Sequence, residues 1–457
     1  MSKHPDVTIL GAGLAGSLMA ILLARRGIQV RLLERRPDLR THQLSAGRSI
    51  NLALADRGIH ALKMAGVYEA IEPLLLPMPG RCVHDLSGHT QFVPYGQRAH
   101  EVIYSISRPG LNQVLLDYAE RLPGVELQFD SEGTEVDFAQ HRLTLLDQHT
   151  RVSRHLNFEQ LIAADGYNSI ARHALLKATQ ASATADLLPH GYKELTLPAN
   201  AQGRHQLDPR ALHIWPRGGF MLIALPNLDG SFTVTLFLPF DSSTDTQESF
   251  AGLHDAPDIE AFFQRHFADA RALMPGLAEE FMAHPTGRMF TVRSSRWTDA
   301  RSTVLIGDAA HAIVPFHGQG MNCAFEDCVE LDALMQQHDF GTACELLEQR
   351  RQPDTNAIAD MALENYIEMR DTVRHPRFLL QKELSFELER RFPDRFIPRY
   401  SMVMFHHEIP YAVAYERGQI QAQILDEVTR RATTMAEVDM QRAAVLVRNR
   451  LTALTAA

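Results

Sequence analysis

The stretch Val7-Thr8-Ile9-Leu10-Gly11-Ala12-Gly13-Leu14-Ala15-Gly16 decides the fold of the first part of the chain. Its four leading apolar residues predict a buried parallel strand, and its glycines predict a tight turn. A helix should follow as far as Arg26, with Gly27 at its C-terminal end, and Gln29 to Leu33 should return as a second strand. This order is a βαβ unit, which predicts an α/β fold with a Rossmann-like, doubly wound sheet.

The glycine-rich turn predicts dinucleotide binding. Only glycine lets a backbone approach a pyrophosphate closely, and the helix beyond it offers free N–H groups and a partial positive charge. Glu34 follows at about the 20-residue spacing of an acid that accepts hydrogen bonds from a ribose 2′-hydroxyl, which favours FAD or NAD over NADP. The alternative for Glu34 is an ordinary surface carboxylate. The cofactor-binding candidates here are Gly11, Gly13, Ala15, Gly16, Leu33, Glu34, Arg35 and Arg36.

The bulk composition is that of a packed globular protein of two or three domain-sized units. The chain has 457 residues, of which 45% are hydrophobic and 22% charged. Its net charge of -10 is spread along the sequence, so nucleic acid is not an expected partner. Four cysteines without a C-x-x-C pair fit a reducing cytoplasm. We find no signal peptide and no apolar run near the roughly 20 residues of a membrane helix, so we expect a soluble protein.

Later segments predict that the cofactor domain is discontinuous. Residues 160–166 and 302–308 each form a strand that runs into an acidic turn. Between them, residues 211–216, 220–225 and 231–238 predict an inserted antiparallel sheet with a hairpin at 227–230, and residues 357–373 predict a helix. We therefore expect an FAD-binding domain (1–75, 101–185, 286–330), a substrate-binding β-sheet domain (76–100, 186–285) and a C-terminal helical region (331–457).

A second turn selects a flavin among the dinucleotides. Asp308 of the Gly307-Asp308 turn can bind ribityl hydroxyls, and the helix that follows Pro315 to Asn322 can stabilise negative charge on a reduced flavin ring. Gly318-x-Gly320 is not a second fingerprint, because Cys323 replaces the third glycine and no strand precedes it. Further cofactor-binding candidates are Ala53, Arg108, Asp165, Asp308, Gly320, Met321 and Asn322.

Three motifs in order carry a family resemblance: Gly11 to Glu34, Asp165-Gly166 with Ser169 and Arg172, and Gly307-Asp308. Together they resemble the class A flavoprotein aromatic hydroxylases, which have the para-hydroxybenzoate hydroxylase fold. One departure is Ala163, where that family usually has glycine. The resemblance implies FAD as cofactor, and NADPH as a transient co-substrate without a domain of its own. It also implies O2 as oxidant, with the reactive oxygen held at flavin C4a as a hydroperoxide, so we assign no catalytic side chain.

Several further segments resemble one branch of that group, the kynurenine 3-monooxygenases in their soluble bacterial form. The resemblance implies hydroxylation of L-kynurenine to 3-hydroxy-L-kynurenine, a step of tryptophan degradation. Mitochondrial members carry a C-terminal membrane segment, whereas residues 437–454 here are polar and amphipathic. The segments are Gly47 to Leu54, His190 to Leu195, Leu212 to Pro216, Glu364 to Met369, and Phe396 to Tyr400 with Met402 and Val403.

Candidate substrate residues come from the same segments. Arg81 and Tyr95 match the carboxylate-binding pair of the branch, since a guanidinium and a phenol both donate to carboxylate oxygens. Asn365 and Tyr400 match two other polar contacts, although a lone arginine is usually a surface charge and a lone tyrosine usually core. The aromatic ring should be held by Ile223, Leu225, Phe237, Pro315, Phe316 and His317.

Other functions remain open at this stage. They are hydroxylation of another aromatic compound such as a phenol, salicylate or quinone precursor, a flavin-binding module without turnover, and a plain NAD-dependent dehydrogenase. We expect no metal, because the 22 histidines include no zinc-type spacing, and we expect His311 to be a packing and hydrogen-bonding residue of its turn. The oligomeric state stays open, a homodimer included.

Overall fold

The structure is a computed structural model that describes residues 6–41, 51–242 and 248–454. It divides into two compact units. The first comprises residues 1–75, 106–188 and 288–359, and the second comprises residues 76–105, 189–287 and 360–457. Residues 47–50 of the segment quoted above lie outside the described residues.

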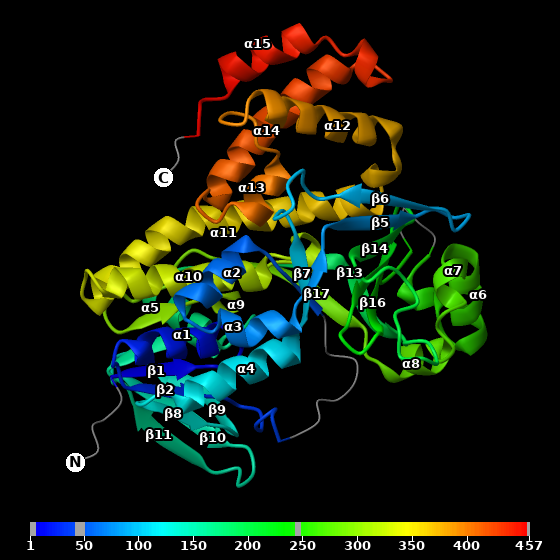
Figure 1. The fold of residues 1–457 in the computed structure, drawn as a ribbon. Coiled ribbons are helices and arrows are strands. Elements are labelled where there is room, and N and C mark those ends of the chain that lie inside the picture. Colours follow the sequence, from blue (N-terminus) through cyan, green and yellow to red (C-terminus); the bar gives the residue numbers. More distant parts are fainter. Residues whose placement is uncertain (1–5, 42–50, 243–247, 455–457) are drawn as a thin grey trace. The chain divides into compact units, whose positions relative to one another are not determined.

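The first unit contains a five-stranded parallel sheet in the order β18-β12-β1-β2-β8 (Figure 1). Crossover helices separate neighbouring strands, which is the doubly wound arrangement that the sequence predicted. The strands are β1 (Val7–Leu10), β2 (Val30–Leu33), β8 (Val125–Gln128), β12 (Gln160–Ala163) and β18 (Thr303–Leu305).

The predicted βαβ unit is confirmed to within one residue at the element ends. Helix α1 (Leu14–Arg25) is buried on nearly all sides, as expected for a helix between a sheet and other helices. It ends one residue earlier than predicted, and Gly27 beyond it has a φ of +83°, the left-handed conformation that glycine adopts at little cost.

A second, antiparallel sheet of the first unit contains β9 (Ser131–Asp137), β10 (Arg142–Asp147) and β11 (Ser153–Asn157). Leu143 and Leu145 of β10 are fully buried in a core that also contains Leu10, Leu33 and Leu161 of the parallel sheet. The other elements are β3 (Asn51–Leu54), most of β17 (Gly287–Ser294), α2 (Asp56–Met64), α3 (Tyr68–Ile71), α4 (Arg108–Arg121), α5 (Ile170–Thr179), α9 (Asp308–His311) and α10 (Gly320–Met335).

The second unit is built on the strands β13-β16-β15-β14-β5-β6 of a sheet in which β17 is the next strand beyond β13. The three central strands are antiparallel neighbours, which confirms the inserted sheet, and Asn227 N–H bonds the Ser231 carbonyl at 2.9 Å to close the predicted hairpin. Strand β5 joins β14 in parallel. The bounds are β5 (Gly80–His84), β6 (Thr90–Pro94), β13 (Ala183–Leu197), β14 (Ala211–Pro216), β15 (Met221–Pro226) and β16 (Phe232–Pro239), with β4 (Leu76–Met78) pairing β7 (Ile103–Ser107) beside it.

This sheet has two different faces. Leu222, Leu236 and their neighbours pack into a cluster of phenylalanines, a Met and a Leu from residues 259–281. Ile223, Leu225 and Phe237 belong to the opposite face, because alternate residues of a strand point to opposite sides. The helices of this region are α6 (Ala256–His266), α7 (Ala268–Arg271) and α8 (Leu277–Ala283).

Helix α11 (Phe340–Arg370) begins in the first unit and ends in the second. The sequence predicted a helical region over residues 331–457 and, within it, a helix over residues 357–373. The observed helix begins earlier than residue 357, continues through Pro353 although proline usually ends a helix, and ends at Arg370. The chain ends in α12 (Pro376–Arg391), α13 (Arg399–Phe405), α14 (Tyr411–Thr429) and α15 (Met440–Arg450), of which α12, α14 and α15 share an apolar core (orange to red in Figure 1).

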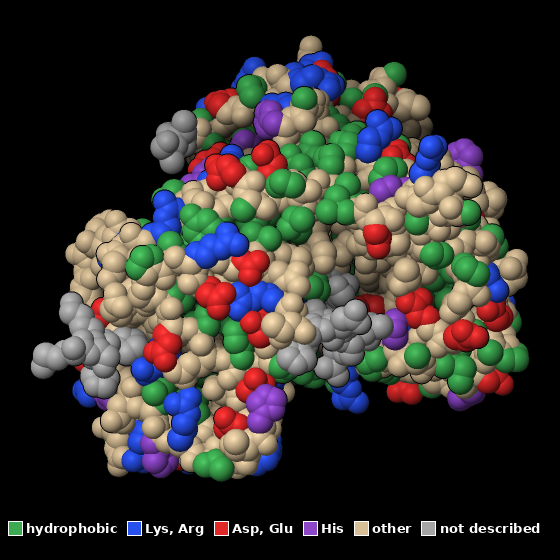
Figure 2. All heavy atoms as spheres, turned by 60° about the horizontal axis from the view of Figure 1, so that its bottom comes forward, with side chains coloured by type: hydrophobic (Ala, Val, Ile, Leu, Met, Phe, Trp, Pro, Cys, Tyr) green, Lys and Arg blue, Asp and Glu red, His purple; other side chains and the backbone are tan. Residues whose placement is uncertain are grey.

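Acidic and basic side chains alternate over the face drawn in Figure 2. Basic groups do not gather there into one large patch. None of the described helices is both long enough and apolar enough to cross a bilayer.

Candidate active site

The glycines of the first turn occupy positions that larger residues would disrupt. Gly11 has a φ of +103°, and a Cβ there would lie 2.4 Å from the Ala164 carbonyl oxygen. A Cβ on Gly16 would lie 1.9 Å from the Gly11 carbonyl oxygen, so α1 can pack against its own turn only with glycine. At Gly13, the N-cap of α1, a Cβ would meet no described atom within 4 Å. The first N–H groups of α1 have no partner within their own helix, so they can donate to a phosphate group placed at this turn.

Glu34 fixes this turn to the end of β2. Its Oε2 accepts a hydrogen bond from Ala12 N–H at 3.0 Å, and its Oε1 accepts from Arg36 N–H and Nε–H at 3.0 and 2.8 Å. The side chain is 8% exposed, so it is not the surface carboxylate of the alternative interpretation. Each carboxylate oxygen can accept a further bond, which leaves room for a ribose hydroxyl.

Asp165 is the second acidic group near this sheet edge. Its Oδ2 accepts from Ile170 N–H at 2.8 Å, while its buried Oδ1 finds no hydrogen-bond partner among the described residues. Burial raises the pKa of Asp165, and the bonds from the start of α5 counteract that rise. A buried acceptor without a donor suits a ligand that brings hydroxyl groups.

Arg172 connects this turn to the third motif. Its Nη1 donates to the Ala309 carbonyl at 2.9 Å, and its Nη2 donates to the Tyr167 carbonyl at 2.6 Å. The guanidinium therefore holds the turn after β12 against α9, where Asp308 is exposed at the first helical residue.

The N-terminus of α10 is held in place by a fully buried amide. Asn322 Oδ1 accepts from Ala55 N–H at 3.0 Å, and its Nδ2 donates to the carbonyls of Ala53 and Gly318 at 2.9 and 2.8 Å. The Asn322 side chain is thus occupied in joining β3 to the turn before α10. What remains for a ligand is the backbone N–H groups of Gly320, Met321 and Asn322 at the positive end of the helix.

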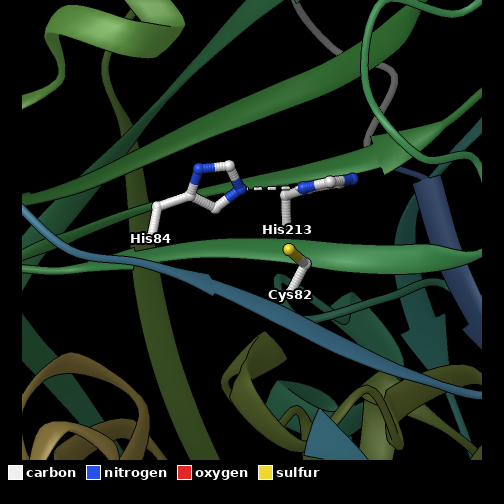
Figure 3. Close-up of side chains that lie close together, drawn as sticks. All are labelled: Cys82, His84 and His213. Carbon is white, nitrogen blue, oxygen red and sulfur yellow. Dashed lines mark hydrogen bonds between the residues drawn. The ribbon is translucent and has the colours of Figure 1, made fainter. Parts of the chain in front are cut away.

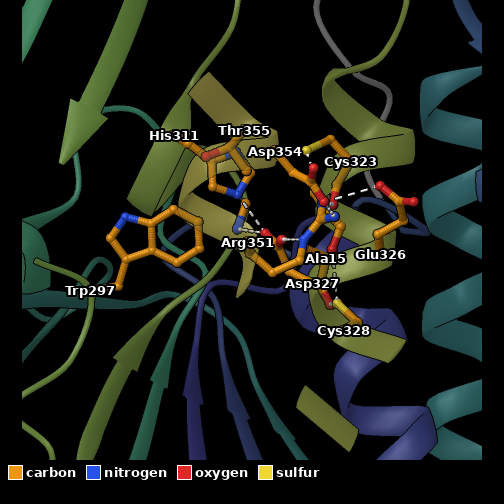
Figure 4. Close-up of polar contacts among 12 residues, drawn as sticks. Ala15, Trp297, His311, Cys323, Glu326, Asp327, Cys328, Arg351, Asp354 and Thr355 are labelled. Atoms are coloured by element: carbon orange, nitrogen blue, oxygen red, sulfur yellow. Dashed lines mark hydrogen bonds and ion pairs between the residues drawn. The ribbon is translucent and has the colours of Figure 1, made fainter. Parts of the chain in front are cut away.

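A buried ion network joins Asp327 of α10 to His311 of α9 and Arg351 (Figure 4). Asp327 accepts hydrogen bonds from Gly307 N–H at 2.9 Å, His311 Nε2 at 2.5 Å and Arg351 Nε at 2.9 Å. Burial acts to raise the pKa of Asp327, but the charges of His311 and Arg351 outweigh it and hold that pKa low. The sequence prediction that His311 supports its turn agrees with this bond, whereas Asp327 and Arg351 were missed.

These groups fit FAD. Such a dinucleotide requires donors for its phosphates and acceptors for its hydroxyl groups. The chain offers a phosphate cradle of N–H groups at Gly13, two carboxylates with acceptor capacity at residues 34 and 165, and a helix N-terminus at residue 320. The remaining cofactor candidates stand as follows: Ala15 in the first turn of α1, Leu33 buried at the end of β2, Arg35 and Arg36 exposed beyond it, Ala53 in β3, and Arg108 exposed at the start of α4.

In the second unit, Arg81 is a buried cation on β5. Its Nη2 donates to Glu368 Oε1 at 3.1 Å, and its buried Nε has no partner among the described residues. Burial acts to lower the pKa of Arg81, but Glu368 and its other neighbours together raise that pKa by more, so the guanidinium is charged. A buried arginine with an unused donor suits a ligand that brings a carboxylate.

Tyr95 and Tyr400 lie beside this arginine. Their rings stack with centroids 5.1 Å apart at 16°, and burial raises the pKa of Tyr95 to about 12 although Arg81 lowers it. Both phenols therefore stay protonated and can donate near neutral pH. Asn365, on α11, donates to Met369 Sδ at 3.3 Å.

The predicted apolar residues of the sheet share a face with Arg81. Register pairs Arg81 with Leu212 of β14, and Ile214 of β14 with Ile223 of β15. Paired residues point to the same side of a sheet, so Ile223, Leu225 and Phe237 project on the Arg81 side. Pro315, Phe316 and His317 belong to the first unit, in the short turn that precedes α10.

Two further charged groups at Arg81 escaped the sequence prediction. Glu368 pairs with Arg81 directly, and Lys382 of α12 lies close enough to Arg81 for their positive charges to repel each other. Burial, together with Arg81, lowers the pKa of Lys382 to about 7, although Glu368 acts in the other direction. Glu368 falls inside the quoted segment 364–369 and could have been named, whereas no local pattern marks Lys382.

Comparisons with known proteins fit this geometry. The model of the FAD binding domain family matches residues 4–365. Kynurenine 3-monooxygenase of Myxococcus xanthus (strain DK1622) is 46% identical over 455 residues, which are 99% of this chain and 96% of that protein. The chain belongs to the kynurenine 3-monooxygenase family. A further family member, from Stenotrophomonas maltophilia (strain K279a), is 46% identical over 95% of this chain and 94% of its own length.

Solved structures agree with the fold of this family. The tetrameric form of 2-methyl-3-hydroxypyridine-5-carboxylic acid oxygenase superposes with a TM-score of 0.66 at 20% identity, covering 82% of this chain and 95% of its own. The p-nitrophenol 4-monooxygenase PnpA from Pseudomonas putida DLL-E4 gives 0.64 at 16% identity, covering 85% and 94%. At such identities the likeness concerns the fold alone, and it confirms the predicted Rossmann-like and antiparallel sheet architecture.

Proposed function

We propose that this chain is an FAD-dependent monooxygenase that converts L-kynurenine, NADPH, O2 and a proton into 3-hydroxy-L-kynurenine, NADP+ and water. The observation that carries the proposal is the identity of 46% with a kynurenine 3-monooxygenase over 99% of the chain. The charged Arg81, on the same sheet face as three apolar side chains, supplies the chemistry that an aromatic amino acid needs.

We assign FAD to the first unit and the groups of the second unit to the substrate. The cradle at Gly13 would take the pyrophosphate, Glu34 the ribose, and Asp165 and Asp308 the hydroxyls of the ribityl chain. When bound, FAD accepts a hydride from NADPH and activates O2, which are steps that no side chain can supply. The N–H groups at the start of α10 would stabilise negative charge on the reduced ring.

The amino-acid end of kynurenine would bind at Arg81. Its free Nε and one Nη can donate to the substrate carboxylate, with the phenol of Tyr95 as a further donor. Glu368 already accepts from Arg81 through Oε1, and its second oxygen would accept from the substrate ammonium group. A bound carboxylate would also stabilise the charged form of Lys382.

The aromatic ring would lie against apolar side chains. Ile223, Leu225 and Phe237 of the second unit offer such a surface. Their task is to orient the ring carbon beside the arylamine and to exclude water from the reacting atoms. The amine lone pair already enriches that carbon in electrons, so no side chain is needed as a general base.

NADPH would bind transiently, because the nicotinamide cofactor has no domain of its own in the class A hydroxylases that the sequence resembles. The four cysteines are free thiols, which fits the reducing cytoplasm where we place the protein. A homodimer remains one assembly to test.

The experiment is a substrate panel on the purified, flavin-loaded protein. We expect NADPH oxidation to accelerate with L-kynurenine and to yield one hydroxylated product per NADPH. A phenol, salicylate or a quinone precursor in place of kynurenine should give neither. Faster turnover with one of those compounds would move the chain to another aromatic substrate, and no turnover with any of them would reduce it to a flavin-binding module.

A further inference from the structure

Cys82, His84 and His213 form a compact cluster on the sheet of the second unit (Figure 3). Cys82 and His84 are alternate residues of β5, and His213 is the β14 residue paired with Cys82. All three side chains therefore project from one face, opposite to the face of Arg81. Their potential ligand atoms lie within 4.8 Å of one another, and both imidazoles are only 2% exposed.

In each imidazole one ring nitrogen, the inner one, faces the other imidazole, and the second, the outer one, faces an acceptor. His84 Nδ1 lies 2.8 Å from Asp269 Oδ2, and Asp269 also accepts from Trp215 Nε1 at 3.0 and 2.9 Å. His213 Nε2 lies 2.9 Å from the Asp208 carbonyl oxygen, which can only accept. Each ring must therefore carry its hydrogen on the outer nitrogen.

With the hydrogens on the outer nitrogens, the two inner nitrogens face each other without a donor between them. His84 Nε2 and His213 Nδ1 face each other at 2.9 Å, as the dashed line in Figure 3 marks. In neutral rings with outer hydrogens, both inner atoms present lone pairs, which repel at this distance. Something positive has to lie between them, and it must be either an extra proton on one ring or a metal ion.

We propose that His84 Nε2, His213 Nδ1 and Cys82 Sγ bind a divalent transition-metal ion, with zinc as the best match to two imidazoles and a thiolate. The thiol distinguishes a metal from a shared proton, because it adds a third donor that a proton would not need. Tetrahedral zinc with Zn–N bonds of about 2.0–2.1 Å separates two imidazole nitrogens by roughly 3.3 Å, so the rings need to part by only a few tenths of an ångström.

The outer acceptors strengthen this assignment. Ligating histidines generally donate their other N–H to a carboxylate or a backbone carbonyl, which fixes the ring and raises its basicity. Asp269 and the Asp208 carbonyl supply one of each. The sequence predicted no metal because zinc-type motifs are local, whereas this donor set needs the parallel pairing of β5 with β14.

The site would also stiffen the substrate strand. Arg81 is the neighbour of Cys82 on β5 and projects from the other face. A metal held by Cys82 and His84 would fix the backbone immediately C-terminal to that arginine. Loss of the metal should therefore raise the KM for the aromatic substrate more than it lowers kcat.

The test uses the full-length, flavin-loaded protein. After metal removal by dialysis against a chelator, we would titrate it with ZnCl2 in competition with a fluorescent zinc chelator, and record the zinc X-ray absorption spectrum. We expect one zinc ion per chain, bound through one sulfur at about 2.3 Å and two nitrogens at about 2.0–2.1 Å. Cys82→Ala and His213→Gln should each weaken binding about 100-fold or more, and Asp269→Asn about 10-fold.

Matched controls remove the same residue types elsewhere. Cys344→Ala removes a buried thiol outside the cluster, and His205→Gln removes a half-buried imidazole whose Nε2 contacts the Asn227 carbonyl. Both should bind zinc like the parent protein. A zinc spectrum without sulfur, or equal zinc affinity in the parent and in His213→Gln, would overturn the proposal and leave a protonated imidazole pair. The spectrum of the parent protein decides the matter even if a variant fails to fold.

Discussion

Replacing Arg81 with methionine removes the charge from the centre of the proposed carboxylate site and keeps most of the side-chain volume. The structure leaves Nε without a partner and one Nη paired to Glu368 at 3.1 Å. A substrate carboxylate would gain two charge-assisted hydrogen bonds, each of about 1.5–3 kcal/mol, and we take about 3 kcal/mol as the net loss after desolvation. That loss corresponds to a fall of about 150-fold in kcat/KM for L-kynurenine, mostly through KM.

The folded protein should survive this change. Glu368 loses its partner, but its side chain is 27% exposed and can be hydrated, so we expect only about 1 kcal/mol of destabilisation. Steady-state kinetics with varied L-kynurenine give kcat and KM, and the visible flavin spectrum confirms that FAD is retained. Arg265→Met is the control, because it breaks the exposed ion pair to Glu248 in the same unit. A change in kcat/KM below about tenfold in the flavin-loaded Arg81→Met protein would refute the assigned role.

Three further predictions follow from the described contacts. Gly16→Ala should abolish FAD binding, because its Cβ would meet the Gly11 carbonyl at 1.9 Å; the flavin absorbance per protein measures this, and normal flavin content would contradict it. Asp327→Asn should cost about 3–5 kcal/mol of unfolding free energy, because it leaves the buried Arg351 undercompensated; urea titration at pH 7 tests this, and a loss below about 1 kcal/mol would contradict it. Lys382 has a folded pKa of about 7, below its unfolded value, so its burial penalty falls as pH rises from about 7 towards 10.5. The gain in stability over that range should disappear in Lys382→Met, and an unchanged pH profile would contradict the burial of this cation.

The local parts of the fold were predictable because their signals are local. The strand, glycine turn and helix at residues 7–26 need only neighbouring residues to specify them, and the structure reproduces them with a difference of one residue. The inserted sheet was equally predictable, since its apolar strands and the 227–230 turn that joins two of them follow one another in the sequence. The start of α11 was not, because packing overrides the usual effect of Pro353.

The supporting charges of the candidate site could not be predicted from local patterns. Asp327 and Arg351 are 24 residues apart, and only the packing of α10 against α11 turns two ordinary helical charges into a buried pair. The same holds for Lys382, whose pKa is lowered by its burial in the folded chain and, to a smaller extent, by Arg81. Arg81 itself was named through a resemblance. Its shared face with Ile223 became visible only through the parallel pairing of β5 with β14.

The most direct measurement of the central claim follows an isotope. The purified protein is incubated with L-kynurenine and NADPH under 18O2, and the products are analysed by mass spectrometry. The proposed function predicts 3-hydroxy-L-kynurenine carrying one 18O atom, in an amount equal to the NADPH consumed. Unchanged kynurenine with stoichiometric hydrogen peroxide, or a hydroxylated product without the label, would contradict it.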